Sequence, residues 1–263
     1  MRVRTEPRPI IKTADELDKM RAANRLARAV LAEMGRRIKP GVTTMDLETE
    51  ARRMTEAAGA KGAFYQYRVG DKVYPYYLCT SINDCVVHGF PNERPLEPGD
   101  IVSIDYGCVL DGFIGDTAWT WSVGEPSPTA RHLMDVTREA LYRGIAMAQP
   151  GRRVFDVARE IQTYCESEGC GVVRALVGHG VGRRMHEPPQ VPNYAAPESR
   201  RDRLRPGMTI CIEPMITAGA WEVYEPEGKW DVLTRDGSLA AHYEHCIAIL
   251  DDGPEILSLP EEI

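Results

Sequence analysis

Five ionisable residues lie in segments that otherwise have the character of buried strands or tight turns. Asp105 and Asp116 belong to IVSIDYGCVLDGFIGDTAWTW, a segment rich in β-branched and aromatic residues. Glu213 closes the apolar stretch MTICIE, Glu244 lies in YEHCIAIL, and His179 lies between glycines in VGHGVG. Buried carboxylates repel one another unless a cation lies between them, and the first segment contains no Lys or Arg. Four carboxylates with one imidazole suit two divalent ions with shared carboxylate bridges better than a closed structural zinc site.

The turn Asp111-Gly112 predicts how the first two of these carboxylates meet. An Asp-Gly pair favours a two-residue type I′ hairpin turn. With the turn at this point, Asp105 pairs with Ala118 and Gly107 pairs with Asp116, so the two carboxylates share one face of the hairpin as diagonal neighbours. Each acid taken singly is more often a salt-bridged or capping residue, and the prediction of a metal centre therefore rests on the joint placement of all five residues.

Two sequence patterns, each built on a Pro-Gly pair, occur twice along the chain and in the same order. A Pro-Gly that is followed by an aspartate and a helical segment occurs at Pro40 and again at Pro150, 110 residues later. In the second pattern, a Pro-Gly pair is followed by a carboxylate seven residues after the proline. This pattern occurs at Pro98, which precedes Asp105, and at Pro206, which precedes Glu213, 108 residues later. The repeat therefore places one candidate ligand of each half in an equivalent position.

Long helical segments precede the first Pro-Gly of each half. One begins near Thr13, where Thr13 and Glu16 form a capping box, and the other begins near Ser127. Strand-like segments follow the helices in both halves. We therefore expect one α+β domain over residues 1–263, with pseudo-symmetric halves at about 13–121 and 127–250, a curved antiparallel sheet and helices on its outer face.

The composition favours a soluble globular protein and argues against a membrane or nucleic-acid-binding protein. The 263 residues are 43% hydrophobic and 27% charged, which is typical of a soluble globular chain with a full core. The net charge of −7 argues against a nucleic-acid binder, and the local Arg/Lys clusters are expected to be solvated faces. No apolar run is long enough for a membrane helix, and MRVRTEPRPIIK lacks the apolar core of a signal peptide. Seven cysteines, an odd number without a CxxC pair, indicate free thiols in the cytoplasm.

Five segments in this order resemble type I methionine aminopeptidase in its short bacterial form: SINDCVVHGFP, GDIVSIDYGCVLDGFIGDT, GHGVGRRMHEPPQV, GMTICIEPM and AHYEHCIAIL. The resemblance covers essentially the whole chain. It implies the pita-bread fold, whose two pseudo-symmetric halves agree with the repeat. It also implies a cytoplasmic, monomeric metalloaminopeptidase that removes the initiator methionine from nascent chains with a small second residue. The partners it implies are nascent N-termini and a ribosome contact near the tunnel exit, with no membrane and no specific nucleic acid.

The resemblance also implies a role for each candidate ligand. Asp105 would hold one metal through both oxygens, His179 and Glu213 would hold the other, and Asp116 and Glu244 would bridge the two. A bridging water or hydroxide would attack the peptide bond, because bound metals lower its pKa. Glu213 would also carry the proton from water to the leaving amine. Co, Mn, Fe, Zn and Ni all tolerate this ligand mixture.

Two further histidines and an apolar pocket are implied for the substrate. His186 would hydrogen-bond the scissile carbonyl and its developing oxyanion, and His88 would contact the substrate near its amino end. The residues at the positions matching the methionine pocket, to which both histidines would add, are Tyr74, Cys79, Met185 and Trp230. Met185 replaces the usual Phe, and His242 replaces a common Gln. The stretch Phe64–Tyr77 is longer than usual, so its contribution to the pocket stays open.

Two alternatives remain. The first is a proline-specific peptidase of the pita-bread fold, which shares the five ligands but usually carries an extra N-terminal domain. The second is a metal-free pita-bread module that binds protein or RNA, in which ligands would be expected to be lost. Peptides that begin Met-Gly or Xaa-Pro distinguish the enzymes, and the metal content distinguishes the binding module.

Overall fold

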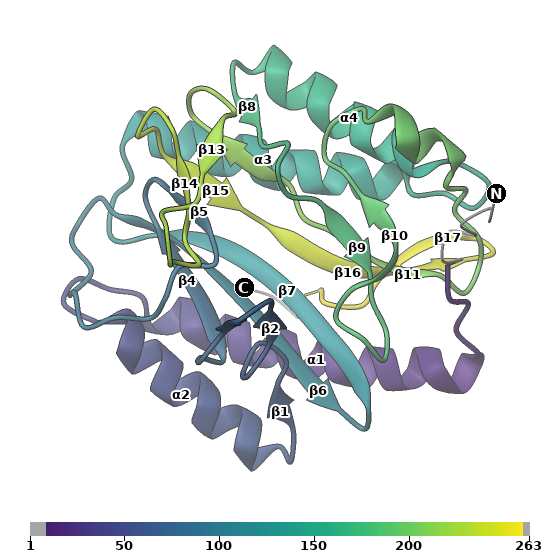
Figure 1. Cartoon of the computed structure of the whole chain (residues 1–263), viewed down its shortest axis with the longest axis horizontal. Helices are drawn as coiled ribbons and strands as arrows, with labels where there is room; N and C mark the ends of the chain where they lie inside the picture. The colour runs from purple at the N-terminus through teal and green to yellow at the C-terminus, as the bar shows by residue number, and fades with distance from the viewer. Residues whose placement is uncertain (1–8, 260–263) are drawn as a thin grey trace.

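A curled antiparallel sheet with helices along its outer face organises the chain (Figure 1). The structure is a computed structural model that describes residues 9–259. Most of the N-terminal stretch in which we expect no signal peptide, residues 1–8, lies outside this range. No helix in the described range is long and apolar enough to cross a membrane. All seven cysteines lie within the range and are free thiols, as predicted.

Four α-helices form the outer layer of the described part of the chain. They are α1 (Ala14–Arg37), α2 (Thr44–Ala57), α3 (Pro128–Met147) and α4 (Val154–Ser167). The helix starts follow from local chemistry that the sequence predicts. Thr13 and Glu16 form the expected capping box of α1, and Ser127 caps α3, whose first residue is a proline.

The main sheet has nine strands, and all of its strand pairs are antiparallel. Its strands in spatial order are β1 (Lys61–Gly62), β6 (Ile101–Leu110), β7 (Phe113–Ser122), β16 (Glu244–Leu250), β11 (Thr209–Ile212), β9 (Gly178–Gly180) and β10 (Glu187–Val191). The two strands that pair off this path are β4 (Leu78–Ile82), beside β6, and β17 (Gly253–Ile256), beside β16.

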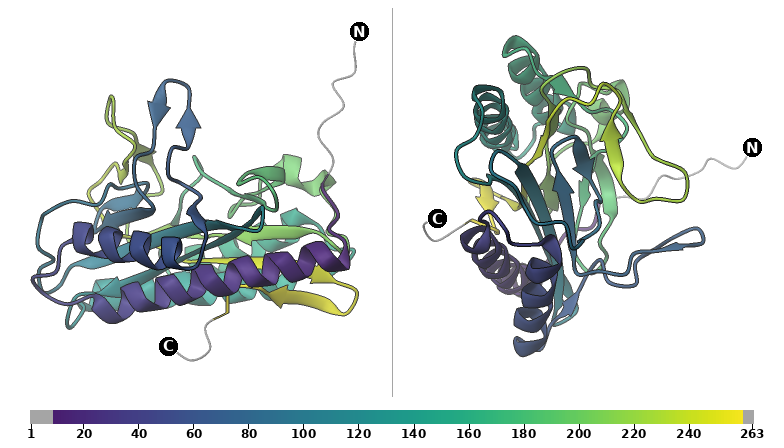
Figure 2. Two further views of the ribbon diagram at one scale, coloured as in Figure 1. Left: turned by 90° about the horizontal axis from the view of Figure 1, so that it is seen from below. Right: turned by 90° about the vertical axis from the view of Figure 1, so that its left-hand side faces the viewer.

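Shorter elements surround the edge of the main sheet. One three-stranded sheet comprises β15 (Ala240–His242), β12 (Met215–Thr217) and β8 (Gly171–Val172). Another comprises β13 (Val223–Tyr224), β14 (Val232–Thr234) and β5 (Cys85–Val87). A hairpin is formed by β2 (Arg68–Val69) and β3 (Lys72–Val73), and a short 3₁₀-helix, η1, spans Pro197–Arg201. Figure 2 shows the β2–β3 hairpin standing away from the body on the same side as the loop between β13 and β14.

The predicted hairpin register between β6 and β7 is confirmed. Asp105 lies opposite Ala118, and Gly107 lies opposite Asp116. The turn residues between the strands, Asp111-Gly112, have φ values of 51° and 77°, the positive values that a type I′ turn requires at both central positions.

The landmarks of the two halves have matching local geometry. Asp46 accepts a hydrogen bond from the backbone N–H of Thr43 at 2.9 Å, and Asp156 accepts one from that of Arg153 at 3.0 Å. The glycine of the Pro-Gly before each of these helices has a φ of 87°. The repeated sequence therefore specifies the same helix entry twice, through one turn conformation and one capping interaction.

The hydrophobic core lies between the sheet and the helices. Ile104 and Tyr106 of β6 are fully buried in a cluster that includes Val30 of α1 and Leu47 of α2. Because side chains alternate along a strand, Asp105 then points to the opposite face of the sheet. In the second half, a larger cluster joins α3 and α4 to β11 and β16. Core packing on one face therefore fixes which residues the other face presents.

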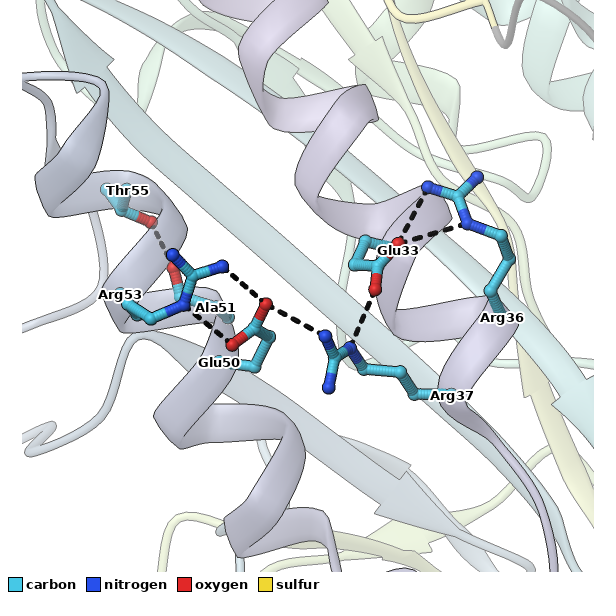
Figure 3. A network of polar contacts seen from close by, with 7 residues as sticks. All are labelled: Glu33, Arg36, Arg37, Glu50, Ala51, Arg53 and Thr55. Atoms are coloured by element: carbon cyan, nitrogen blue, oxygen red, sulfur yellow. Dashed lines mark hydrogen bonds and ion pairs between the residues drawn. The ribbon is translucent and has the colours of Figure 1, made fainter.

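The basic residues at the end of α1 belong to an ion-pair network (Figure 3). Glu33 forms ion pairs with Arg36 and Arg37, and in each pair a guanidinium nitrogen lies 2.8 Å from a carboxylate oxygen. Arg37 also reaches Glu50 on α2 at 3.0 Å, and Glu50 binds Arg53 at 2.7 Å. Acidic neighbours therefore balance the charge of this cluster, in agreement with the expected solvated face.

Candidate metal centre

The candidate ligands come from strands at the centre of the main sheet. Asp105 of β6 and Glu244 of β16 both lie opposite Ala118 of β7. Glu213 directly follows the last residue of β11, and β11 pairs with both β16 and β9, the strand that carries His179. Side chains on this face of the sheet therefore converge from β6, β7, β16, β11 and β9.

Several of the predicted ligands lie close together in the structure. His179 Nε2 lies 3.7 Å from Asp116 Oδ2 and 3.5 Å from Glu213 Oε1. Asp116, His179 and Glu244 also belong to a buried group whose potential ligand atoms all lie within 4.8 Å of one another. The fourth member of this group is Cys211, which the sequence did not indicate as a ligand.

Several carboxylate oxygens of this cluster are buried without a partner. Asp105 Oδ1, Asp116 Oδ1 and Glu244 Oε1 accept no hydrogen bond from any other part of residues 9–259. Such orphaned oxygens are rare and costly in a protein interior, because dehydration of a charged group is not compensated. Oxygen atoms together with one imidazole nitrogen form a donor set that suits divalent cations. The residues present therefore fit a metal centre.

The acidity of the four carboxyl groups reflects their crowding. Burial raises the pKa of Asp105 to about 7. Burial raises the pKa of Asp116, Glu213 and Glu244 well above the ordinary range, and the neighbouring carboxylates raise these pKa values further. Neighbouring carboxylates thus disfavour ionisation of Asp116, Glu213 and Glu244, and a multivalent cation would relieve this repulsion.

The histidines of the site are neutral at physiological pH. Burial lowers the pKa of His179 to about 3 and that of His88 to about 4, with a smaller effect from the nearby His186 in both cases. His179 Nδ1 lies 2.9 Å from the carbonyl oxygen of Gly180, and because a carbonyl only accepts, Nδ1 carries the proton. The lone pair of Nε2 therefore faces the carboxylates in the form that binds metals.

A cavity of about 350 Å³ opens beside the ligand cluster. All of the residues predicted for substrate contact line it: Tyr74, Cys79, His88, Met185, His186 and Trp230. The Tyr74 hydroxyl donates to the backbone carbonyl of Leu78 at 2.9 Å, and its ring meets that of Trp230 edge-to-face at 5.4 Å. These contacts leave the aromatic faces of the pocket in fixed orientations.

His88 adopts an unusual backbone conformation. Its φ of 62° lies in the left-handed region, which is unfavourable for a residue other than glycine. The next residue, Gly89, has no room for a side chain, because an added Cβ would lie 2.4 Å from the carbonyl oxygen of Thr80. The close backbone approach therefore fixes the direction in which His88 points, and its ring meets Trp230 edge-to-face at 6.4 Å.

His186 is held by a residue that the sequence could not place. The hydroxyl of Tyr67 lies 2.6 Å from His186 Nδ1, and the His186 ring lies 4.5 Å from the His179 ring. Within the long stretch Phe64–Tyr77, β2 and β3 form a hairpin whose base closes with a 2.8 Å hydrogen bond from the Tyr74 N–H to the Tyr67 carbonyl. The hairpin therefore keeps both tyrosines at the cavity, and Lys72 at its tip donates to the carbonyl of Lys229.

The sequence of the chain matches known proteins over most of its length. The model of metallopeptidase family M24 matches residues 18–251. The chain belongs to this family. A methionine aminopeptidase of Clostridium acetobutylicum is 45% identical over 253 residues, which cover 96% of this chain and 99% of that protein. The crystal structure of methionine aminopeptidase from Thermotoga maritima shares 43% identity with a TM-score of 0.91, covering 96% of this chain and 100% of the other.

Solved structures of proline-specific peptidases are more distant from this chain. A prolidase structure from Pyrococcus furiosus is 23% identical with a TM-score of 0.76, and the alignment covers 97% of this chain but only 66% of the other. This likeness shows the fold alone. Together, the neighbours confirm the predicted pita-bread fold and the predicted resemblance to methionine aminopeptidase. Membership of family M24 also confirms the prediction of a hydrolase that uses divalent metal.

The cavity wall includes residues that sequence reasoning did not assign to the site. Unassigned residues on the cavity wall are Phe64, Tyr67, Val69, Val87, Leu176, Val177, Met215 and His242. His242 had been noted only as a departure from Gln, and its Nε2 lies 3.8 Å from Glu213 Oε2. Tyr65, in contrast, is exposed and stacks near Tyr77 at 5.3 Å. Tyr67 directly precedes the β2–β3 hairpin, and no pattern in the sequence indicated its contact with His186.

Proposed function

We propose that this protein removes the initiator methionine from nascent polypeptides whose second residue is small. It would act in the cytoplasm as a monomer with one catalytic domain over residues 1–263. The observation that carries this proposal is a cavity of about 350 Å³ beside the buried carboxylate–histidine cluster, with an apolar and aromatic wall. Its size suits one unbranched apolar side chain next to a reacting bond. The names of the relatives support the same activity.

Five residues would hold two divalent ions in this proposal. Asp105, Asp116, His179, Glu213 and Glu244 would together hold the ions. The orphaned carboxylate oxygens and the free Nε2 of His179 support this assignment. When bound, the ions supply a Lewis acid and lower the pKa of an attacking water. Co, Mn, Fe, Zn and Ni are the candidates that the experiment below compares.

Glu213 would move the proton. Its carboxylate lies 3.5 Å from His179 Nε2 and borders the cavity, so it can face both the attacking water and the peptide nitrogen. Burial raises the pKa of Glu213 well above its ordinary range, and Asp116 and Asp105 raise it further. These shifts belong to the site without ions; once ions neutralise the neighbouring carboxylates, the position of Glu213 beside the cavity is what would let it take a proton from water and deliver it to the leaving amine.

His186 would stabilise charge on the scissile carbonyl oxygen. Burial lowers the pKa of His186, so the neutral imidazole is the relevant form. If Tyr67 donates its hydroxyl proton to Nδ1, the Nε2 of His186 carries the ring proton and can donate it toward the cavity. A donor that is already oriented stabilises a developing oxyanion without reorganisation. His88, which also lines the cavity, would contact the amino end of the substrate and the leaving nitrogen.

The methionine side chain would lie among Tyr74, Cys79, Met185 and Trp230. Met185 is 8% exposed and packs in a cluster with Phe64 and Tyr67. A thioether is more adaptable than the Phe ring it replaces, and sulfur makes favourable contacts with aromatic edges. This pocket would therefore accept methionine and resist charged or branched first residues.

The alternatives receive less support from the site. A proline-specific enzyme shares the fold, but those neighbours are only 23% identical or similarly distant. A metal-free module would not need buried carboxylates with orphaned oxygens. A ribosome contact remains a proposal, and the Arg36–Arg37 cluster offers it little free charge, because Glu33 and Glu50 pair with these arginines.

The test is a peptide panel assayed after reconstitution with each metal in turn. Peptides that begin Met-Gly and Met-Ala should be cleaved, whereas those that begin Met-Phe, Leu-Gly or Xaa-Pro should be cleaved poorly. A chelator should abolish cleavage, and a divalent metal should restore it. Cleavage of Xaa-Pro in preference to Met-Gly would replace the proposal with the proline-specific alternative. Full activity without metal would refute the metal centre.

A further inference from the structure

Two buried cysteines form a cross-strand pair next to the candidate metal centre. Cys211 of β11 lies directly opposite Cys246 of β16. Cys211 precedes Glu213 by two residues, and Cys246 follows Glu244 by two, so both thiols lie on the face that carries the carboxylates. Both cysteines are fully buried, and neither forms a disulfide. The proposed function assigns no role to either residue.

Cys211 has the spacing of a ligand. In the structure without ions its thiol donates a hydrogen bond to Asp116 Oδ2, with Sγ at 3.8 Å from that oxygen, and His179 Nε2 lies 3.7 Å from the same oxygen. A tetrahedral ion with a sulfur bond of about 2.3 Å and oxygen bonds of about 2.0 Å holds these donor atoms about 3.5 Å apart. The Sγ atom is also one of the four potential ligand atoms that lie within 4.8 Å of one another.

The unpartnered oxygens provide a second, independent observation. Asp116 Oδ1 and Glu244 Oε1 belong to the same group of four and have no hydrogen-bond partner in the described part of the chain. Both carboxylates come from buried residues that are at most 2% exposed. The group thus combines two incompletely satisfied carboxylates, an imidazole with a free Nε2 and a thiol around one small volume. Such a set binds a divalent ion of intermediate softness.

We propose that Cys211 is a sulfur ligand of one ion in this centre, beside Asp116, His179 and Glu244. The proposal rests on the metal centre of the proposed function and adds a donor to it. On binding, the thiol S–H bond breaks, its proton passes to solvent, and the sulfur lone pair forms the bond to the cation. No electron is transferred. A thiolate favours Zn, Fe or Co over harder ions such as Mg or Mn.

The test uses the full-length protein loaded with Co(II). A cobalt–thiolate bond gives a charge-transfer absorption band in the near ultraviolet, which oxygen and nitrogen ligands do not give. We expect the band in the wild-type protein, its loss in Cys211→Ser at the same cobalt content, and its retention in Cys246→Ser. Cys246→Ser is the matched control, because it makes the same change at the other cysteine of this cross-strand pair.

X-ray absorption by the wild-type cobalt protein keeps the proposal testable if Cys211→Ser fails to fold or to bind cobalt. A sulfur atom about 2.3 Å from the metal is then expected. A cobalt shell of oxygen and nitrogen alone, a missing band, or a band that persists in Cys211→Ser would overturn the proposal. These results would leave the proposed function intact if the loaded protein cleaves Met-Gly peptides. Failure to bind any divalent ion would instead refute the proposed metal centre itself.

Discussion

A buried ion pair ties the start of the chain to the loop that carries His186. Lys12 Nζ lies 2.7 Å from Glu187 Oε2, and the two side chains are only 3% and 2% exposed. The other oxygen of Glu187 accepts the backbone N–H groups of Arg183 and Arg184 at 3.1 and 3.2 Å. Lys12 therefore neutralises the carboxylate that fixes the turn immediately before His186. We predict that Lys12→Met destabilises the fold and misplaces this histidine.

The magnitude follows from the burial of the pair. Removal of one partner of a buried ion pair leaves the other charge uncompensated and costs about 3–5 kcal/mol. For a domain of this size, about 1 kcal/mol shifts the melting temperature by about 2–4 °C, so a decrease of about 10 °C is expected. Adding Glu187→Gln should recover part of this loss, because the amide is neutral and its oxygen can still accept the two backbone N–H groups. Coupling between the two changes should be about 2 kcal/mol.

The same change should lower catalysis without removing the metal. The turn just before β10 carries Met185 and His186, and a displacement of about 1 Å can cost about 100-fold in rate. We therefore expect kcat for a Met-Gly peptide to fall about 10- to 100-fold, measured below the melting transition. The metal content should stay constant, because the proposed ligands lie on other segments and on the neighbouring strand β9.

The assay combines calorimetry, metal analysis and steady-state kinetics on four proteins. They are the wild type, Lys12→Met, the double variant with Glu187→Gln, and the matched control Lys39→Met, which makes the same substitution at an exposed lysine. The control should change stability by less than about 0.5 kcal/mol. The prediction is refuted if Lys12→Met changes the free energy of unfolding by less than about 0.5 kcal/mol. It is also refuted if Glu187→Gln recovers none of the stability lost in Lys12→Met.

Three further predictions concern the site itself. Tyr67→Phe removes the hydroxyl that contacts His186, and loss of about 1 kcal/mol should lower kcat about fivefold at constant KM; an unchanged kcat would contradict the positioning of His186. Glu213→Gln should lower kcat about 10²–10⁴-fold with the fold retained, and more than a tenth of wild-type kcat would exclude Glu213 as the base. In chelated protein, burial raises the pKa of Asp105 to about 7 from its ordinary 3.8, so the folded state binds more protons between these values. Its melting temperature should therefore fall as pH rises from about 4 to 7, and divalent metal should remove this slope, whereas a rise over the same interval would contradict the effect of burial on Asp105.

The sequence alone determined the elements that depend on short-range chemistry. Asp111-Gly112 fixed the β6–β7 register, because a type I′ turn requires positive φ at two adjacent residues and the side-chain period of two then places Asp105 and Asp116 on one face. Capping residues such as Thr13 fixed the helix starts. The candidate ligands were also visible, because carboxylates within apolar strands conflict with their surroundings unless a cation is present.

Only the tertiary structure decided the contacts that join distant segments. Lys12 and Glu187 are 175 residues apart, and the Tyr67–His186 hydrogen bond spans 119 residues. Cys211 gave no sign of its place among the ligands, because a cysteine in an apolar strand is compatible with ordinary core packing. These contacts arise from the curl of the sheet and from loops that fold over its edge. A residue's own neighbours in sequence determine which face its side chain takes, but the packing of the whole chain determines what that side chain meets.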